Sequence, residues 1–140
     1  WAWITVVGPV VFWEGTFNQS LLLIFLERAF FVFAITIPFD IRDLMLDQEG
    51  KVSTIPGQLG IERAKRIAYT ALGLAFACVL LNVWSAQYSW DSAATLILSL
   101  LVSGLLIRNS HPHQHDYYFT GALDGTMILQ ALLIWFTLKQ

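Results

Sequence analysis

Long runs of apolar residues alternate with shorter polar segments along this chain of 140 residues. The apolar runs cover residues 1–13, 20–39, 67–84, 92–107 and 121–138. A helix crosses the hydrocarbon core of a bilayer with about 20 residues, and the apolar–polar alternation that is typical of a strand is absent. The pattern therefore predicts an all-α, multispanning transmembrane helix bundle, in which the short first run is a helix cut at the start of the chain.

Two details qualify these predicted helices. The run at 92–107 is slightly short for a span, so we expect flanking residues to extend it or the bilayer to thin around it. Pro38, near the end of the second run, is expected to kink that helix or to help end it, because proline cannot donate a backbone hydrogen bond. Tryptophans near the predicted helix ends are typical of an aromatic belt at the membrane interfaces: Trp13, Trp84, Trp90 and Trp135.

Successive crossings of one membrane fix which polar segments share a side. Residues 40–66 and 108–120 are predicted to lie on one side, and residues 14–19, 85–91 and the C-terminus on the other. The first side holds most of the basic residues, namely Arg42, Lys51, Arg63, Lys65, Arg66 and Arg108, whereas the second holds only Lys139. Cytoplasmic loops carry an excess of lysine and arginine. We therefore predict a multi-pass protein of the inner or plasma membrane, with residues 40–66 facing the cytoplasm.

The composition of the chain supports a lipid environment and argues against nucleic acid as a partner. Charged residues make up 13% of the chain, about half their share in soluble domains. The net charge of -2 produces no basic field that would attract nucleic acid. The single cysteine, Cys78, lies in an apolar run and is interpreted as a small buried hydrophobic residue. Because the chain opens with Trp1 inside an apolar run, we expect it to be the C-terminal part of a longer protein whose first helices are missing here.

The stretch from Asp40 to Gly60 is the candidate for chemistry. If the helix continues past Phe39, then Asp40, Asp43 and Asp47 fall at i, i+3 and i+7 and form a carboxylate stripe on one face. Like charges so placed repel one another, and a hard divalent cation would neutralise them. Mg²⁺ prefers oxygen ligands and binds through one or two carboxylates plus substrate phosphates. The stripe therefore predicts an Mg²⁺–diphosphate site rather than a closed metal cage.

Basic and hydroxyl side chains in the same stretch fit a diphosphate. Arg42 and Lys51 are close enough in sequence to contact phosphate oxygens, and Thr54 is expected either to hydrogen-bond a phosphate or to cap the following turn. The basic residues Arg63, Lys65 and Arg66 come at the start of the next helix. They either contact substrate or anchor that helix among the lipid headgroups.

This stretch resembles the second aspartate-rich motif of the UbiA family of intramembrane prenyltransferases. Asp43 and Asp47 supply the aspartate pair, with Asp40 as an earlier acid. Gly50-Lys51, Thr54 and Leu59-Gly60 supply the rest, over about twenty residues. The resemblance implies that residues 1–140 are the C-terminal half of a UbiA-like membrane domain. The family's first motif, Asn-Asp followed by spaced acids, does not occur here, so it lies upstream of Trp1 or this lineage has lost it.

The resemblance also implies a function. The complete protein would be an Mg²⁺-dependent prenyltransferase, which moves a prenyl group from a prenyl diphosphate to an aromatic or other lipophilic acceptor, as in quinone biosynthesis. In this reading Asp43 and Asp47 are catalytic metal ligands, Asp40 is a further carboxylate, and Arg42, Lys51 and Thr54 bind substrate. With only one of the two motifs, the present chain is not expected to turn over substrate without its missing N-terminal helices.

Two other functions stay open. One is a non-catalytic protein of the same fold that binds a lipid or a partner protein. The other is a transporter segment, in which Glu27, Arg28 and Asp124 would be coupling residues, since ionisable groups at membrane depth usually face the bundle interior. Structural pairing and substrate contact are the alternatives for Glu27 and Arg28. Three alternating histidines, His111, His113 and His115, lack the spacing of a zinc site and are interpreted as a solvated loop or as a lid over the acidic stretch.

Overall fold

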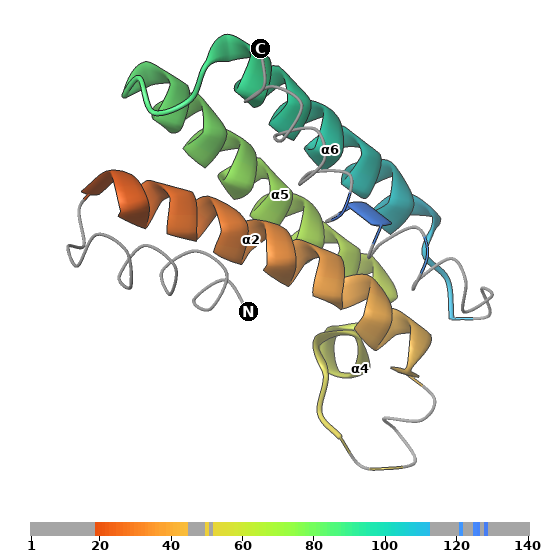
Figure 1. The fold of residues 1–140 in the computed structure, drawn as a ribbon. Coiled ribbons are helices and arrows are strands. Elements are labelled where there is room, and N and C mark those ends of the chain that lie inside the picture. Colours follow the sequence, from red (N-terminus) through yellow and green to blue (C-terminus); the bar gives the residue numbers. More distant parts are fainter. Residues whose placement is uncertain are drawn as a thin grey trace.

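A computed structural model describes residues 19–44, 50, 52–112, 121, 125, 126 and 128. Within these ranges the regular structure is helical and contains no strand. In the described part of the chain the helices with defined bounds are α2 (Gln19–Arg42), α4 (Ile55–Leu59), α5 (Ile61–Trp84) and α6 (Trp90–Asn109). Figure 1 shows α2, α5 and α6 as three long helices, with the single turn of α4 at one end of them. The predicted all-α fold class is confirmed for this part of the chain.

The three long helices have the length and composition of membrane spans. They contain 24, 24 and 20 residues, which at 1.5 Å per residue gives about 30 to 36 Å, the thickness of a hydrocarbon core. Their apolar spans are Leu22–Arg42, Ile61–Trp84 and Trp90–Asn109. The helices predicted at 20–39, 67–84 and 92–107 are therefore confirmed, and each extends beyond the predicted run. The predicted helices at 1–13 and 121–138 lie outside the described residues, apart from four isolated positions of the second.

The N-terminal boundary predicted for α5 was six residues late. The prediction followed the uncharged run from Ile67, whereas the helix begins at Ile61 and includes a charged first turn and a half. Glutamate, arginine and lysine are good helix formers, so charge ends the apolar run without ending the helix. Pro38 likewise does not end α2, which continues for four residues beyond it to Arg42.

Small side chains hold α2 and α5 together. One face of α5 is buried along its whole length and carries mainly small residues: Ala64, Ala68, Ala71, Ala75 and Cys78. Against this face α2 buries larger side chains, including Phe31 and Ile35. Of the described helix pairs, α2 and α5 make the most extensive contact. Small residues at such an interface let two helix backbones approach closely inside a membrane. Cys78 is buried here, as predicted.

The helices α5 and α6 lie antiparallel and side by side (Figure 1). A short connection joins them, and Ser89 caps α6 by accepting a hydrogen bond from the Ser92 amide at 3.2 Å. Near the far end of the pair, the Tyr69 hydroxyl donates to the Gly104 carbonyl at 3.2 Å, and the Lys65 ammonium donates to the Arg108 carbonyl at 3.0 Å. Both bonds cross from α5 to α6 and fix their register.

Candidate functional site

Charged side chains gather at one end of the bundle. The C-terminal ends of α2 and α6 meet the beginning of α5 there, next to α4 (Figure 1). Among the described residues this end holds five cations, Arg42, Arg63, Lys65, Arg66 and Arg108. The opposite end carries Trp84 and Trp90, which are 86% and 78% exposed, as expected of an aromatic belt. The described parts of the two segments predicted to share one side of the membrane, residues 40–44 and 52–66 and residues 108–112, therefore lie at one end of the bundle.

The helix α2 delivers two of the predicted aspartates to this end. It continues past Phe39, which was the condition for the predicted carboxylate stripe. Asp40 lies in its last turn, and Asp43 follows the helix end with its amide bonded to the Phe39 carbonyl at 3.0 Å. The third aspartate, Asp47, lies outside the described residues, so the predicted register is met for the first two acids.

Arg42 binds the carboxylate of its neighbour Asp43. Its Nε donates to Oδ1 at 2.6 Å and its Nη2 to Oδ2 at 2.9 Å, a bidentate pair. The guanidinium also lies 5.4 Å from the centre of the Phe39 ring. The hydrogen bonds from Arg42, with its positive charge, hold the pKa of Asp43 below its usual value of 3.8. The carboxylate is therefore ionised at neutral pH, as a metal ligand needs to be.

Thr54 is the N-cap residue of α4, but its side chain takes no part in the cap. Its side chain makes no capping hydrogen bond, and its Oγ1 is buried with no hydrogen-bond partner in the described part of the chain. Thr54 is therefore the N-cap residue of α4, as the capping alternative predicted, but it caps through its backbone carbonyl, which accepts from the Gln58 amide at 3.0 Å, and not through its side chain. A buried hydroxyl without a partner is uncommon in folded proteins and often marks a functional position.

Gly57 brings the two halves of the acidic stretch together. A Cβ atom added to Gly57 would lie 3.2 Å from Thr54 Oγ1 and 3.8 Å from Leu44 Cδ1. Leu44 directly follows Asp43, so α4 packs against the chain where it leaves α2. Leu44 and the turn from Thr54 to Gly57 thus form one compact corner of the bundle, although twelve residues separate Leu44 from Gly57 in sequence.

Gly60 turns the chain from α4 into α5. It is the C-cap residue of α4 and the N-cap residue of α5. Its φ of 81° lies in the left-handed region that favours glycine. The Leu59-Gly60 step singled out in the sequence therefore has a backbone explanation. Sequence reasoning missed α4 itself, although a threonine followed by Ile55-Pro56 is a signal for a helix start.

The Asp43 carboxylate at this corner supplies oxygen atoms of the kind that Mg²⁺ accepts, and Arg42 contacts both of them. Within the described ranges no three histidine, cysteine, aspartate or glutamate side chains come together as a metal cluster. Two of the predicted site residues, Asp47 and Lys51, lie outside those ranges.

The other basic and histidine residues at this end differ in role. Lys65 is 7% exposed and its ammonium binds the Arg108 carbonyl, where it satisfies a carbonyl that α6 itself leaves free. Neither of its two predicted roles, substrate contact or headgroup anchoring, describes that position. Arg63 and Arg66 are exposed. His111 is exposed just beyond α6 at this same end, while His113 and His115 lie outside the described residues.

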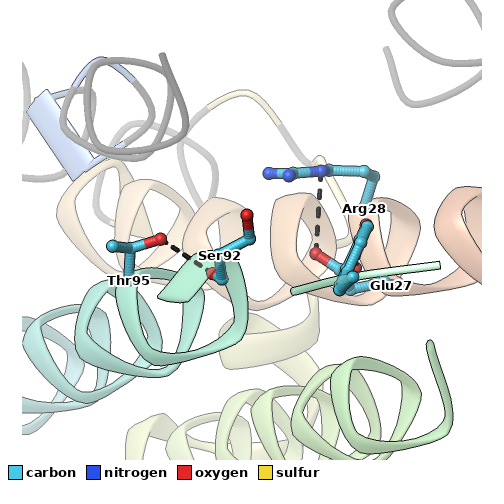
Figure 2. A network of polar contacts seen from close by, with 5 residues as sticks. Glu27, Arg28, Ser92 and Thr95 are labelled. Carbon is cyan, nitrogen blue, oxygen red and sulfur yellow. Dashed lines mark hydrogen bonds and ion pairs between the residues drawn. The ribbon is translucent and has the colours of Figure 1, made fainter. Parts of the chain in front are cut away.

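A buried polar group lies toward the opposite end. The Glu27 side chain is 1% exposed and accepts a hydrogen bond from the Tyr88 hydroxyl at 2.8 Å. Figure 2 shows Arg28 beside Glu27 on α2, with Nε 3.7 Å from Oε1, near Ser92 in the first turn of α6. Burial and the neighbouring Glu27 carboxylate raise the pKa of Tyr88. This arrangement fits the structural pairing expected of Glu27. Asp124, the other acid considered with it, is not among the described residues.

Sequence reasoning did not identify Tyr88 as the partner of Glu27. Sixty-one positions separate the two residues, and Tyr88 belongs to the short connection between α5 and α6. Only the folded arrangement of three helices brings them together.

Comparison with known proteins gives no relative. No protein-family model, no curated protein and no solved structure matches the chain.

Proposed function

We propose that this chain forms part of an Mg²⁺-dependent intramembrane prenyltransferase of the UbiA type, with its active site at the charged end of the bundle. The observation that carries the proposal is the compact corner between α2 and α4. There the ionised Asp43 and the buried Thr54 hydroxyl belong to segments that contact each other at Gly57. A motif whose two halves pack together can act on a single ligand.

The roles proposed for the residues follow from their chemistry. Asp43 and Asp47 hold the metal, with Asp40 as a further carboxylate on the same face of α2. The metal, when bound, neutralises charge that develops on the leaving diphosphate. Arg42 orients the Asp43 carboxylate through its bidentate contact and contributes positive charge next to the diphosphate.

The remaining polar groups bind the diphosphate and the helices exclude water. Lys51 supplies a positive charge to the phosphate oxygens, and the Thr54 hydroxyl donates a hydrogen bond to one of them. The apolar helices keep water away from the allylic carbon as its bond to the diphosphate breaks, so that the lipophilic acceptor rather than water is prenylated. In this proposal the charged end faces the cytoplasm, where the basic residues concentrate, in the inner or plasma membrane.

The test is Mg²⁺-dependent binding and transfer by the full-length protein in lipid nanodiscs. A fluorescent prenyl diphosphate is titrated with and without Mg²⁺, and transfer to a panel of lipophilic aromatic acceptors is followed by mass spectrometry. We expect Asp43→Asn and Asp47→Asn each to abolish the Mg²⁺-dependent part of binding. Glu62→Gln is the matched control, because Glu62 is an exposed acid at the same end of the bundle, in the first turn of α5.

The outcomes separate the proposal from its main rival. Unchanged Mg²⁺-dependent binding in both aspartate variants contradicts the metal assignment. Binding that requires both aspartates but leads to no transfer with any acceptor favours a non-catalytic protein that binds a lipid diphosphate.

A further inference from the structure

A groove runs between α5 and α6, apart from the aspartate-rich corner. It has a volume of about 600 Å³ and is lined by apolar side chains of both helices. Gly73 leaves part of its wall open, since nothing lies within 4 Å of a Cβ added there. On the other wall, Leu101 and Leu105 are 63% and 60% exposed. These features make the groove an apolar surface directed out of the bundle.

One end of the groove is positively charged. Arg108, the only charged residue among its lining residues, lies in the last turn of α6 and has an exposed side chain. The Arg108 carbonyl is bound by Lys65, which brings a second cation to the same helix end. The acid Glu62 lies near this end of α5, together with Arg63 and Arg66. Among the described residues, cations therefore outnumber acids where the groove meets the charged end of the bundle.

The length of the groove matches half a bilayer. Its lining residues on α6 run from Ile97 to Arg108, which corresponds to about 16 Å along a helix. The hydrocarbon core of a bilayer is about 30 Å thick, so one leaflet contributes about 15 Å. A chain in the groove would thus end at the depth where lipid headgroups begin, and Arg108 lies at that end.

We propose that the groove between α5 and α6 binds an anionic phospholipid, with an acyl chain along Gly73 and Leu101 and its phosphate at Arg108. The groove is apolar, has the depth of one leaflet and ends at a cation. It is therefore complementary to a phospholipid, whose apolar acyl chain ends at a negatively charged headgroup. This site is independent of the proposed prenyl transfer, because it uses neither the aspartates nor Thr54.

A second groove in the bundle provides an internal comparison. It lies between α2 and α5, is lined by residues that include Ala29, Phe33 and Leu74, and has no ionisable residue among its lining residues. A lipid chain in that groove would not distinguish one headgroup from another. Of the two grooves, only the one between α5 and α6 should therefore select an anionic headgroup, and this selectivity should depend on Arg108.

The experiment uses the full-length protein in nanodiscs that contain photoactivatable phosphatidylglycerol or, separately, photoactivatable phosphatidylcholine. Cross-linked peptides are identified by mass spectrometry, and neither Mg²⁺ nor prenyl diphosphate is present. Two variants test the site: Arg108→Gln removes the charge, and Gly73→Leu fills the groove. Two matched controls are Arg63→Gln, an exposed arginine that does not line the groove, and Ala29→Leu, which fills the second groove.

The proposal predicts cross-links from phosphatidylglycerol to the α5–α6 groove that exceed those from phosphatidylcholine. Arg108→Gln should lower this labelling about fivefold, which corresponds to the loss of one basic residue near an anionic lipid surface. Gly73→Leu should abolish it, and both controls should leave it unchanged. Equal labelling by the two lipids, or labelling that persists in both test variants, overturns the proposal. No labelling of the groove by either lipid would overturn it in favour of a covering helix or a second copy.

Discussion

The guanidinium of Arg42 holds both carboxylate oxygens of Asp43, at 2.6 and 2.9 Å, although the two residues are adjacent in sequence. This contact keeps the pKa of Asp43 below 3.8. Because the pKa of the folded state is lowered, the pair contributes stability above about pH 4 and loses that contribution as the pH falls through the lowered pKa. At neutral pH the contact orients the Asp43 carboxylate.

Removing the guanidinium should release Asp43. In Arg42→Gln we expect the pKa of Asp43 to rise toward 3.8, because the largest cause of its lowering is the hydrogen bond from Arg42. The measurement is a carboxyl ¹³C NMR titration of the protein labelled at aspartate, with Asp43→Asn used to assign the signal. Arg63→Gln is the control and should leave the titration unchanged. An Asp43 signal that titrates alike in wild type and Arg42→Gln would contradict the role of the pair.

The buried Glu27–Tyr88 contact should matter more for stability than the exposed Tyr69–Gly104 contact. Tyr88→Phe removes the hydroxyl that donates to a carboxylate which is 1% exposed, and a hydrogen bond to a charged group contributes about 1.5–3 kcal/mol. Tyr69→Phe removes a hydrogen bond to a neutral carbonyl, for which about 0.5–1.5 kcal/mol is typical. Unfolding of both variants in mixed detergent micelles measures the difference. If the two variants lost the same free energy of unfolding, the hydrogen bond from Tyr88 to Glu27 would contribute no more to stability than the exposed one.

Much of this fold could be predicted from apolar runs, because a membrane helix is defined by its length and hydropathy alone. The runs located α2, α5 and α6, but they could not locate helix ends that carry charge. The start of α5 at Ile61 rather than Ile67 is the clearest case. A hydrophobic run reports where lipid begins, whereas hydrogen bonding and good helix formers decide where the helix begins.

The candidate site was predictable only as far as it is local. Asp40 and Asp43 follow from helix register, and Leu59-Gly60 was noted in the sequence only as part of a motif, before the structure showed the positive φ of Gly60. The bond from Lys65 to the Arg108 carbonyl and the bond from Tyr88 to Glu27 join residues 43 and 61 positions apart. No periodicity within one helix contains that information. Such contacts depend on how the three long helices pack against one another.

That face gives a direct test of helix packing. Ala75 is fully buried in α5, whereas Ala77 in the same helix is exposed. Ala75→Leu forces a larger side chain between α5 and the rest of the core and should cost about 1–3 kcal/mol or more. Ala77→Leu adds the same atoms on an exposed surface and should cost much less. Unfolding in detergent micelles compares the two, and similar stability of the two variants would show that close approach of the helices is not required.

The Thr54 hydroxyl can be tested separately for its effect on stability and for its effect on substrate binding. Its Oγ1 is buried without a partner among the residues that the structure describes, and its side chain does not cap α4. Thr54→Val keeps the β-branched shape and removes only the hydroxyl. Since a buried polar atom without a partner is unfavourable, the variant should be as stable as the wild type or more stable.

Binding of prenyl diphosphate, in contrast to stability, should be weakened by Thr54→Val. If the Thr54 hydroxyl donates to a phosphate oxygen of the substrate, then Thr54→Val loses a hydrogen bond to a charged group, about 1.5–3 kcal/mol, or roughly tenfold to a hundredfold in Kd. Titration of prenyl diphosphate into the full-length protein in nanodiscs measures this, and Ser53→Ala is the control because Ser53 is exposed beside it. Thr54→Val with unchanged Kd would remove Thr54 from the site. A variant that binds more weakly only because it is less stable would show that the hydroxyl has a structural role after all.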